Sequence, residues 1–507
     1  MNDTQYSPQA IRERLGHPVV DADGHFLEFV PVLNQYLREE GVPGGMAEAV
    51  RAGGIGSRNW DLLSPEERVS RRSTIKPWGL TPIENAVDLC TGLLPKLTHK
   101  RLPELGIDFA ILYPSGGLTF LTIQDDDTRR AACRALNRYA TDMYADFSDR
   151  LCPVATIPMH TPEEAVAELE YSVKQLGAKA ALISGWTERR VEAAQSIPEA
   201  ADFATWHDFY GIDSVYDYDP VWAKAVELGV PLSIHSVGMG WGSRRSISNY
   251  VYNHIGHFAA AMEASAKSLF LGGVTRRFPD LRIGFLEGGV QWAVSLFADL
   301  IGHWEKRNIE AVQAYNPERL DGPAVLSLIM THGGELLSRI ADTSRLQQEF
   351  DELRSVLSGT QDPMDDFAHV GVERPEDIRD LFVPNFYFGC EADDPMTGTA
   401  FNTKVNPYGV QLNAIFSSDI GHWDVPDMRQ VLAEAYEAVE HGWLTSSAFR
   451  DFVFTNVARF YTDANPDFFE GTTVASDALA LRRPQHAAGS TGESVHNETA
   501  GSLGSTR

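Results

Sequence analysis

Two carboxylates and an imidazole stand on alternate positions directly after a pair of valines near the start of the sequence. The stretch is VVDADGHFLE, residues 19–28, and the three side chains belong to Asp21, Asp23 and His25. In a β-strand, positions i, i+2 and i+4 face the same side. Burying these three groups together costs free energy unless a cation pairs with them. A polar turn at Asp23-Gly24 just beyond a strand is the ordinary interpretation of this stretch. A metal site is the alternative, and the rest of the chain has to support it.

Three further groups able to bind a metal close apolar runs elsewhere in the chain. His235 ends the run in PLSIHS, Glu287 ends the run in RIGFLEGG, and Asp419 ends the run in AIFSSDIGHWD. Strand ends are often polar, and His235 by itself is typical of a histidine at the start of a loop. Imidazole nitrogen and carboxylate oxygen are nevertheless common ligands of divalent metals. Several runs that end in such groups indicate one site if the runs are neighbouring strands.

The elements that would position these groups are short apolar strands that alternate with amphipathic helices. This alternation predicts a parallel sheet covered by helices. Eight strands in succession predict an α/β fold of the (β/α)₈ TIM-barrel type, although a doubly wound sheet gives a similar pattern. Catalytic groups of a TIM barrel lie at the carboxyl ends of its strands. The candidate strands are 19–23, 109–113, 151–158, 179–184, 230–235, 281–287, 385–390 and 412–418, and the candidate helices are 126–147, 162–176, 220–228, 258–278 and 428–441.

Some stretches do not fit a bare barrel. Residues 17–470 form the expected barrel domain, with insertions at about 40–105, 185–216 and 303–384. The last of these contains SRLQQEFDELRSVLSG, a helical pattern that predicts an inserted helical subdomain. The tail at 480–507 lacks apolar periodicity, and we expect it to be disordered.

Composition and charge narrow the classes of function. The chain has 507 residues with 43 Lys and Arg against 70 Asp and Glu, a net charge of -27, which repels nucleic acid and anionic lipid. Its four cysteines form no C-x-x-C pair, so they indicate no disulfide framework. The first residues lack the apolar segment of a signal peptide, and no run approaches the roughly 18 apolar residues of a membrane helix. We therefore expect a cytoplasmic protein that binds a small molecule and forms a homo-oligomer, a dimer.

The order and content of several segments resemble the amidohydrolase-related family. This is the metal-dependent TIM-barrel group that includes aminocarboxymuconate semialdehyde decarboxylase and resorcylate-type decarboxylases. The similarity extends over about 17–470 apart from the insertions. The segments that carry it are VVDADGHFLE, LGIDFAILYPS, ALNRYATDMYADFSDRLCPVATIPMHTPEEAVAELE, YDPVWAKAVELGVPLSIHS, RRFPDLRIGFLEGGVQW and SSDIGHWD.

The resemblance implies a set of metal ligands in this chain. The family's first-strand pair, usually His-x-His or Glu-x-His, corresponds to Asp23 and His25. The fifth-strand ligand corresponds to His235, and the eighth-strand aspartate corresponds to Asp419. The chain departs from the pattern at its first ligand, which is Asp, and at the sixth strand, where the decarboxylases named above have His and this chain has Glu287. Two carboxylates and two neutral imidazoles would balance one divalent cation and leave a position for water or substrate.

The number of metal ions follows from the fourth strand. A two-metal site of this family would need a bridging, carboxylated lysine at the end of that strand. The sequence has Ser184-Gly185 there, and Lys179 lies too early. We therefore expect one divalent ion, zinc in the first place, with manganese and iron as alternatives because mixed nitrogen and oxygen ligands do not distinguish them.

Two reactions fit the expected site. In a hydrolase, the metal activates a water molecule, and Asp419 takes its proton and passes it to the leaving group. In a non-oxidative decarboxylase, or carboxy-lyase, the metal binds a substrate carboxylate and an acid protonates the carbon that loses carbon dioxide. The missing sixth-strand histidine favours a hydrolase of a small, aromatic or carboxylate-bearing substrate, with Glu287 as the second catalytic residue. The decarboxylase is the alternative, and a non-catalytic binding protein is the third possibility.

Four more residues are candidates for orienting the ligands or contacting the substrate. Asp21 would hold the ligands from behind or serve as a buried structural carboxylate. His422 follows Asp419 by three positions. Trp241 lies in SVGMGWGSRR, whose glycine spacing is not G-x-G-x-x-G and indicates an active-site loop. Arg244 follows this loop and could bind a substrate carboxylate, with a solvated surface position as the alternative.

Overall fold

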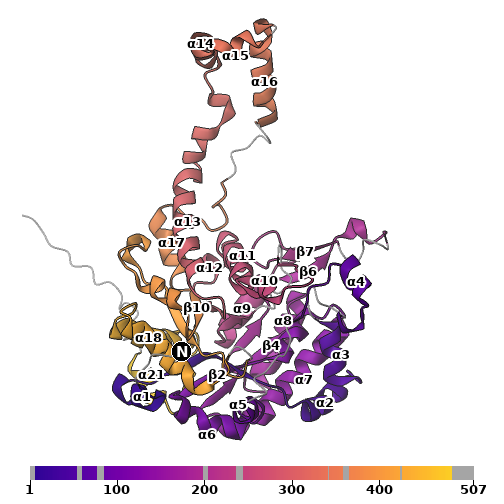
Figure 1. The fold of residues 1–507 in the computed structure, drawn as a ribbon, viewed down its shortest axis with the longest axis vertical. Helices are drawn as coiled ribbons and strands as arrows, with labels where there is room; N and C mark the ends of the chain where they lie inside the picture. Colours follow the sequence, from indigo (N-terminus) through magenta and orange to yellow (C-terminus); the bar gives the residue numbers. More distant parts are fainter. Residues whose placement is uncertain are drawn as a thin grey trace, which may run out of the picture.

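Parallel strands and the helices that connect them form a (β/α)₈ barrel (Figure 1). The computed structural model describes residues 6–53, 60–76, 85–197, 204–235, 244–340, 342–357, 365–422 and 425–481. The predicted α/β TIM barrel is confirmed. Its strands are β1 (Val20–Phe26), β2 (Phe109–Pro114), β3 (Leu151–Pro153) continued by β4 (Ala155–Ile157), β5 (Ala181–Ile183), β8 (Leu232–Ile234), β9 (Ile283–Phe285), β10 (Phe386–Glu391) and β11 (Asn413–Ser417).

The strands close into a ring through backbone hydrogen bonds at two joins. One sheet runs β1-β2-β3 and the other runs β11-β10-β9-β8-β5-β4. The first join is at Val154, whose N–H donates to Leu112 O before the next residue turns to the neighbouring strand. At the second join, Asp419 N–H donates to Asp23 O over 3.0 Å, and His25 N–H donates to Ile420 O over 2.7 Å. The barrel therefore closes at the residues predicted to bind metal.

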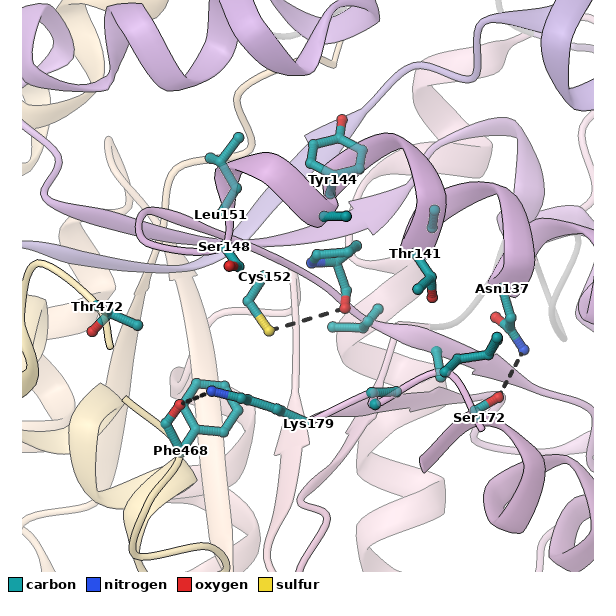
Figure 2. A pocket seen from close by; sticks show the side chains of 18 of the residues that line it. Asn137, Thr141, Tyr144, Ser148, Leu151, Cys152, Ser172, Lys179, Phe468 and Thr472 are labelled. Atoms are coloured by element: carbon teal, nitrogen blue, oxygen red, sulfur yellow. Dashed lines mark hydrogen bonds between the residues drawn. The ribbon is translucent and has the colours of Figure 1, made fainter. Parts of the chain in front are cut away.

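A cavity of about 230 Å³ lies at the amino ends of β2, β3 and β5, where it is also lined by α7 (Asp126–Tyr144), α8 (Pro162–Lys174) and Phe468 (Figure 2). The Lys179 ammonium group reaches its edge and donates to Phe468 O over 2.8 Å. Burial raises the pKa of the Cys152 thiol to about 12, so this cysteine is not a ready nucleophile. Lys179 is thus held at the end of the barrel opposite to the predicted ligands. This position agrees with the expectation that it does not bridge two metals.

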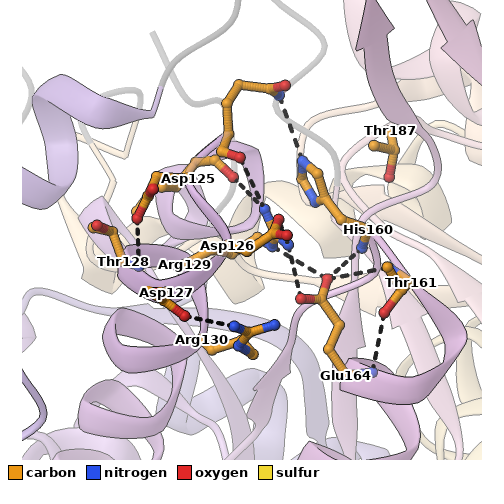
Figure 3. Close-up of polar contacts among 12 residues, drawn as sticks. Asp125, Asp126, Asp127, Thr128, Arg129, Arg130, His160, Thr161, Glu164 and Thr187 are labelled. Atoms are coloured by element: carbon orange, nitrogen blue, oxygen red, sulfur yellow. Dashed lines mark hydrogen bonds and ion pairs between the residues drawn. The ribbon is translucent and has the colours of Figure 1, made fainter.

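Helices α7 and α8 are joined by a buried ion pair beside β4 (Figure 3). Arg129 Nη2 lies 2.8 Å from Glu164 Oε2, and both side chains are almost completely buried. The Glu164 carboxylate also accepts the N–H of His160, and Thr161 caps α8 by accepting the N–H of Glu164. Removing one member of such a buried pair typically costs about 3–5 kcal/mol. The network fixes the loop that leaves the third barrel strand.

The remaining helices mostly follow the predicted positions, with two differences. The predicted helix over 258–278 divides into α11 (His257–Leu271) and α12 (Val274–Arg277), because Gly273 takes a φ of 73°. The helix predicted over 428–441 begins as a 3₁₀ turn, η10 (Met428–Gln430), and continues as α18 (Val431–Glu440). The other helices near the barrel are α1 (Pro8–Leu15), α2 (Val30–Glu39), α3 (Gly45–Ala52), α4 (Pro65–Ser70), α5 (Ala86–Leu93), α6 (Pro95–Leu105), α9 (Asp219–Leu228), α10 (Tyr250–His254), α13 (Gln291–Arg307), α17 (Pro375–Phe382), α19 (Ser446–Arg450), α20 (Asn456–Thr462) and α21 (Ala475–Ala480).

The stretches predicted as insertions contain regular elements of their own. Residues 185–216 hold the antiparallel hairpin of β6 (Thr187–Arg190) and β7 (Thr205–Asp208). The third stretch carries α14 (Gly322–His332), α15 (Gly334–Ser338) and α16 (Leu346–Leu357) away from the barrel (Figure 1). The domain division itself stays a prediction, and the tail beyond residue 481 lies outside the described residues. Within the described chain, every helix is too short or too polar to span a membrane.

Candidate metal centre

The first strand carries a β-bulge where it enters the candidate site. Asp21 pairs with Ala110, but Gly24 pairs with Leu112, so β1 has one residue more than β2 between these pairs. The extra residue interrupts the alternation of side chains. Because His25 pairs with Tyr113, one position further along, its side chain and that of Asp21 lie on opposite faces. The expectation that Asp21 shares a face with His25 is therefore wrong.

Asp21 instead ties the first barrel strand to the last one. Its carboxylate accepts the backbone N–H of Ser418 at 2.9 Å, the hydroxyl of Ser418 at 2.5 Å and the backbone N–H of Asp23 at 3.1 Å. Burial raises the pKa of Asp21 to about 6, although the Ser418 hydrogen bonds oppose this shift. The contact holds Asp23 and the residue before Asp419 in one network, directly behind the predicted ligands.

Three predicted ligands meet in the buried centre of the barrel mouth. His25 Nε2 and His235 Nε2 lie 3.1 Å apart. Asp23 Oδ1 lies 3.7 Å from His25 Nε2 and 3.9 Å from His235 Nε2. All three side chains are buried, and neither carboxylate oxygen of Asp23 accepts a hydrogen bond from the described residues. Two nitrogen atoms and a carboxylate thus converge on one small space.

Three more side chains that could bind a metal lie beside these ligands: Asp419, Glu287 and His422. Asp419 Oδ1 lies 3.4 Å from His25 Nε2 and 2.7 Å from His422 Nδ1. Glu287 Oε2 lies 2.9 Å from His235 Nε2. The ring of His422 stacks on that of His25, with centroids 3.7 Å apart. The structure therefore brings the four predicted ligands into two groups that share His25. One group is Asp23, His25 and His235, and the other is His25, Asp419, Glu287 and His422.

The electrostatics of the cluster suit a bound cation. Burial lowers the pKa of His25 well below its usual value and also lowers the pKa of His235, so both imidazoles are neutral and offer a lone pair. Burial raises the pKa of Asp23 well above its usual value, against the effect of His235, and Glu287 raises it further. A cation between these groups would lower the pKa of Asp23 again, because it stabilises the charged carboxylate.

The distances between donor atoms also fit a metal. Ligands bound at about 2.1 Å to one ion, at angles of about 90–110°, lie roughly 3.0–3.4 Å apart. The separations of 3.1 Å between the His25 and His235 nitrogens and of 3.4 Å between His25 and Asp419 fall in this range. Asp23 Oδ1, at 3.7 and 3.9 Å from the same two nitrogens, lies slightly farther away. The residues present therefore fit one divalent ion.

Glu287 and Asp419 hold an unusual backbone conformation. Their φ angles are 61° and 52°, in the left-handed region that non-glycine residues rarely adopt. Such residues cost about 1–3 kcal/mol each and concentrate at active sites. The conformation turns each carboxylate into the barrel mouth directly after a strand. A glycine follows each of them in a left-handed position, Gly289 at 64° and Gly421 at 99°.

Two cavities adjoin the donor cluster and were not expected from the sequence. One, of about 260 Å³, is lined by Phe258, Glu287 and the carboxylates Glu391 and Asp394. The other, of about 290 Å³, is bordered by Asp419 and shares Glu391 with the first. Glu391 is the last residue of β10, so it obeys the same rule, a polar group at a strand end, that pointed to the ligands. Both cavities are sized for a small molecule.

The other predicted site residues lie at the rim or outside the described residues. Trp241 belongs to the stretch 236–243, which the described ranges do not include. The half-buried Arg244 lies near α10, where its Nε donates to Ile255 O over 3.3 Å. Trp186 is buried against Ala261 and meets the ring of His207 edge-on.

Fold and site together define a TIM-barrel protein with a candidate metal centre at the carboxyl ends of its strands. The chain belongs to the amidohydrolase family, and residues 105–357 match the family model described as Amidohydrolase. The resemblance read from the sequence is thereby confirmed.

The individual proteins that this chain resembles have low sequence identity to it. The decarboxylase orsB of Emericella nidulans is 28% identical over 188 residues, which are 34% of this chain and 50% of that protein. The match thus spans about half the length of this curated relative. Among solved structures, 2,6-dihydroxybenzoate decarboxylase from Rhizobium has 15% identity and a TM-score of 0.47, with 88% of this chain and 99% of the other covered. The amidohydrolase map2389c from Mycobacterium avium subsp. paratuberculosis K-10 has 14% identity and a TM-score of 0.49, with the same coverage.

Proposed function

We propose that the protein is a metal-dependent carboxy-lyase that removes carbon dioxide from a small organic acid, aromatic or unsaturated. The observation that carries this proposal is the cluster of imidazoles and carboxylates at the carboxyl ends of the barrel strands. The curated relative that is named a decarboxylase supports the reaction class. The sequence favoured hydrolysis because the sixth strand lacks a histidine. Glu287 Oε2 lies 2.9 Å from His235 Nε2, so the sixth strand still supplies a side chain at the proposed metal site.

Asp23, His25, His235 and Asp419 would hold the single divalent ion. When bound, such an ion supplies Lewis-acid polarisation of a substrate carboxylate or carbonyl oxygen. Zinc stays the first expectation for this mixed nitrogen and oxygen donor set, with manganese and iron as alternatives. Asp21 and Ser418 act from behind, because their hydrogen bonds fix the strands from which Asp23 and Asp419 project.

Decarboxylation also needs a proton donor at the reacting carbon. The bond between that carbon and the carboxylate breaks, the electron pair stays on carbon, and the carbon then takes a proton while carbon dioxide leaves. Glu287 suits the delivery of this proton because its carboxyl group lies between the donor cluster and the 260 Å³ cavity. His422 Nδ1 lies 4.0 Å from Glu287 Oε1 and would return a proton to it after each turnover.

Hydrolysis is the second candidate, and the contact between Asp419 and His422 favours it. Their atoms Oδ1 and Nδ1 lie 2.7 Å apart, which suits a carboxylate that takes a proton from water and a partner that carries it onward. The family and the predicted ligands are common to both reactions, so products must separate them.

The deciding experiment follows carbon dioxide, solvent hydrogen and solvent oxygen in one set of reactions. Metal-loaded protein is offered hydroxybenzoates, unsaturated acids, lactones and amides in deuterium oxide and, separately, in oxygen-18 water. We expect carbon dioxide release, one deuterium on the carbon that lost the carboxylate, and no oxygen-18 in the organic product. Label from oxygen-18 water without carbon dioxide would establish the hydrolase instead. His235→Ala should abolish the activity, whereas His303→Ala, at an exposed position of α13, is the matched control.

A further inference from the structure

The segment from 308 to 357, here called the arm, leaves the barrel after α13. Helix α13 buries Leu296, Phe297 and Leu300 in the protein core, and the chain beyond it extends outward with α14, α15 and α16 at the far end (Figure 1). Among the arm's described side chains, only Leu346 is buried. The arm therefore gains little stabilisation from the barrel. With Leu346 as its one buried side chain among the described residues, it also leaves much apolar surface in water.

Helix α14 shows this exposure most clearly. Val325, Leu326 and Ile329 are partly buried, at the helical spacing of one face. Leu328, which is 60% exposed, and Met330, which is 57% exposed, lie on either side of that face, about 200° apart around the helix. The helix sequence GPAVLSLIMTH contains no Lys, Arg, Asp or Glu. A solvent-facing helix of an acidic protein would be expected to carry charges, so the exposed part of α14 is typical of a covered surface.

The exposed apolar area of the arm matches what a stable interface needs. At a mean exposure near one half, large apolar side chains contribute roughly 50 Å² each, or roughly 450 Å² for the set. An interface is roughly 57% non-polar, which scales this area to roughly 800 Å² per partner, the usual size for a specific complex. The exposed residues are Ile309, Tyr315, Leu320, Leu328, Met330, Leu336, Ile340, Leu353 and Val356.

We propose that the arm is a self-association surface, on which the arm of one copy, α14 included, packs against the arm of a second copy of this chain. The absence of charge on α14 disfavours a partner recognised through charge, and it lets two identical helices meet without opposing carboxylates. Two-fold pairing covers the same patch on both copies, which is the common symmetry of soluble homo-oligomers. The net charge of -27 disfavours an anionic membrane as the occupant.

The test measures the mass of the full-length, metal-loaded protein in solution by sedimentation equilibrium over a wide range of concentrations. We expect a species of twice the chain mass of 56.0 kDa. The double variant Leu328→Asp, Met330→Asp should weaken the association by roughly a hundredfold, because it places charges on the exposed apolar surface of α14. The matched control changes Val405 and Leu479 to Asp, which are 72% and 56% exposed on the barrel, and should leave the mass unchanged.

A cross-link gives an independent measurement. Thr331 is exposed one helical turn beyond Leu328, so Thr331→Cys should form a disulfide-linked dimer on mild oxidation. Circular dichroism and metal content report whether each variant keeps its fold and the candidate site, and both should be unchanged because the arm is remote from the barrel mouth. A wild-type protein that is monomeric throughout, or a dimer that survives the double Asp variant, overturns the proposal.

Discussion

The hydroxyl of Ser418 offers a direct test of the link between barrel closure and the candidate metal centre. Ser418 is buried, its hydroxyl donates to Asp21 Oδ2, and its oxygen accepts the N–H of Ile420 at 3.2 Å. The change Ser418→Ala therefore removes a partner from a buried carboxylate and another from a buried backbone N–H. Each such loss costs about 1–3 kcal/mol, so we expect the unfolding free energy to fall by about 2–6 kcal/mol.

The same substitution should weaken metal binding without touching a ligand. Asp21 and Ser418 hold the strands that carry Asp23 and Asp419, and loss of such supporting contacts typically lowers metal affinity by about 10- to 100-fold. Thermal unfolding measured without metal gives the structural part. Competition with a chelator then gives the metal affinity of each variant.

The neighbouring serine provides the control. Ser417 is also fully buried, but its hydroxyl has no hydrogen-bond partner among the described residues. Ser417→Ala therefore removes the same atoms without breaking a contact, and we expect it to leave stability and metal affinity close to those of the wild type. The reasoning would be refuted if Ser418→Ala behaved like Ser417→Ala, or if Ser417→Ala were the more damaging change.

Three further predictions concern the ligands, the proton donor and pH. The wild-type protein should contain about one divalent ion per chain by elemental analysis, and His235→Ala should lose most of it; equal loading of both would contradict the site. Glu287→Gln should keep fold and metal while turnover falls by roughly a hundredfold, whereas near-normal turnover would assign Glu287 a structural role. Burial lowers the pKa of His207 to about 4. Because the unfolded chain takes up this proton near the ordinary pKa of 6.5, stability should fall as the pH drops from 6.5 to 4. His207→Phe, which keeps an aromatic ring against Trp186, should flatten the fall in melting temperature over this range, and an unchanged slope would exclude His207 as its source.

The strand positions could be predicted because their signals are local. The run NFYFGC predicted a strand at 385–390, and β10 spans Phe386–Glu391. The run LNAIFSS predicted 412–418, and β11 spans Asn413–Ser417. Apolar runs of this length, separated by helical patterns, leave few arrangements other than a parallel sheet covered on its outside. Since the carboxyl ends of such strands meet at one mouth, the side chains that end them could be expected together.

The bulge in β1 and the role of Asp21 could not be predicted in this way. The alternation in VVDADGHFLE places Asp21 and His25 on one face, whereas the pairing of Gly24 with Leu112 separates them. The partner of Asp21 is Ser418, a residue 397 positions away, and neither segment contains a sequence pattern that predicts this contact. Likewise, the left-handed backbone of Glu287 and Asp419 is imposed by the loops around them and opposes their own preference.

The sequence by itself determined the barrel, its family and the chemical types of the donors, because hydrophobic period and strand-end chemistry are properties of short segments. Only the tertiary structure decided which donors share a space. It brought His25 Nε2 to 3.1 Å from His235 Nε2, added His422 by stacking it on His25, and turned Asp21 away to Ser418. It also directed the arm away from the barrel and left α14 exposed. These outcomes depend on contacts between segments that are hundreds of residues apart, and their geometry is set by the closure of the ring as a whole.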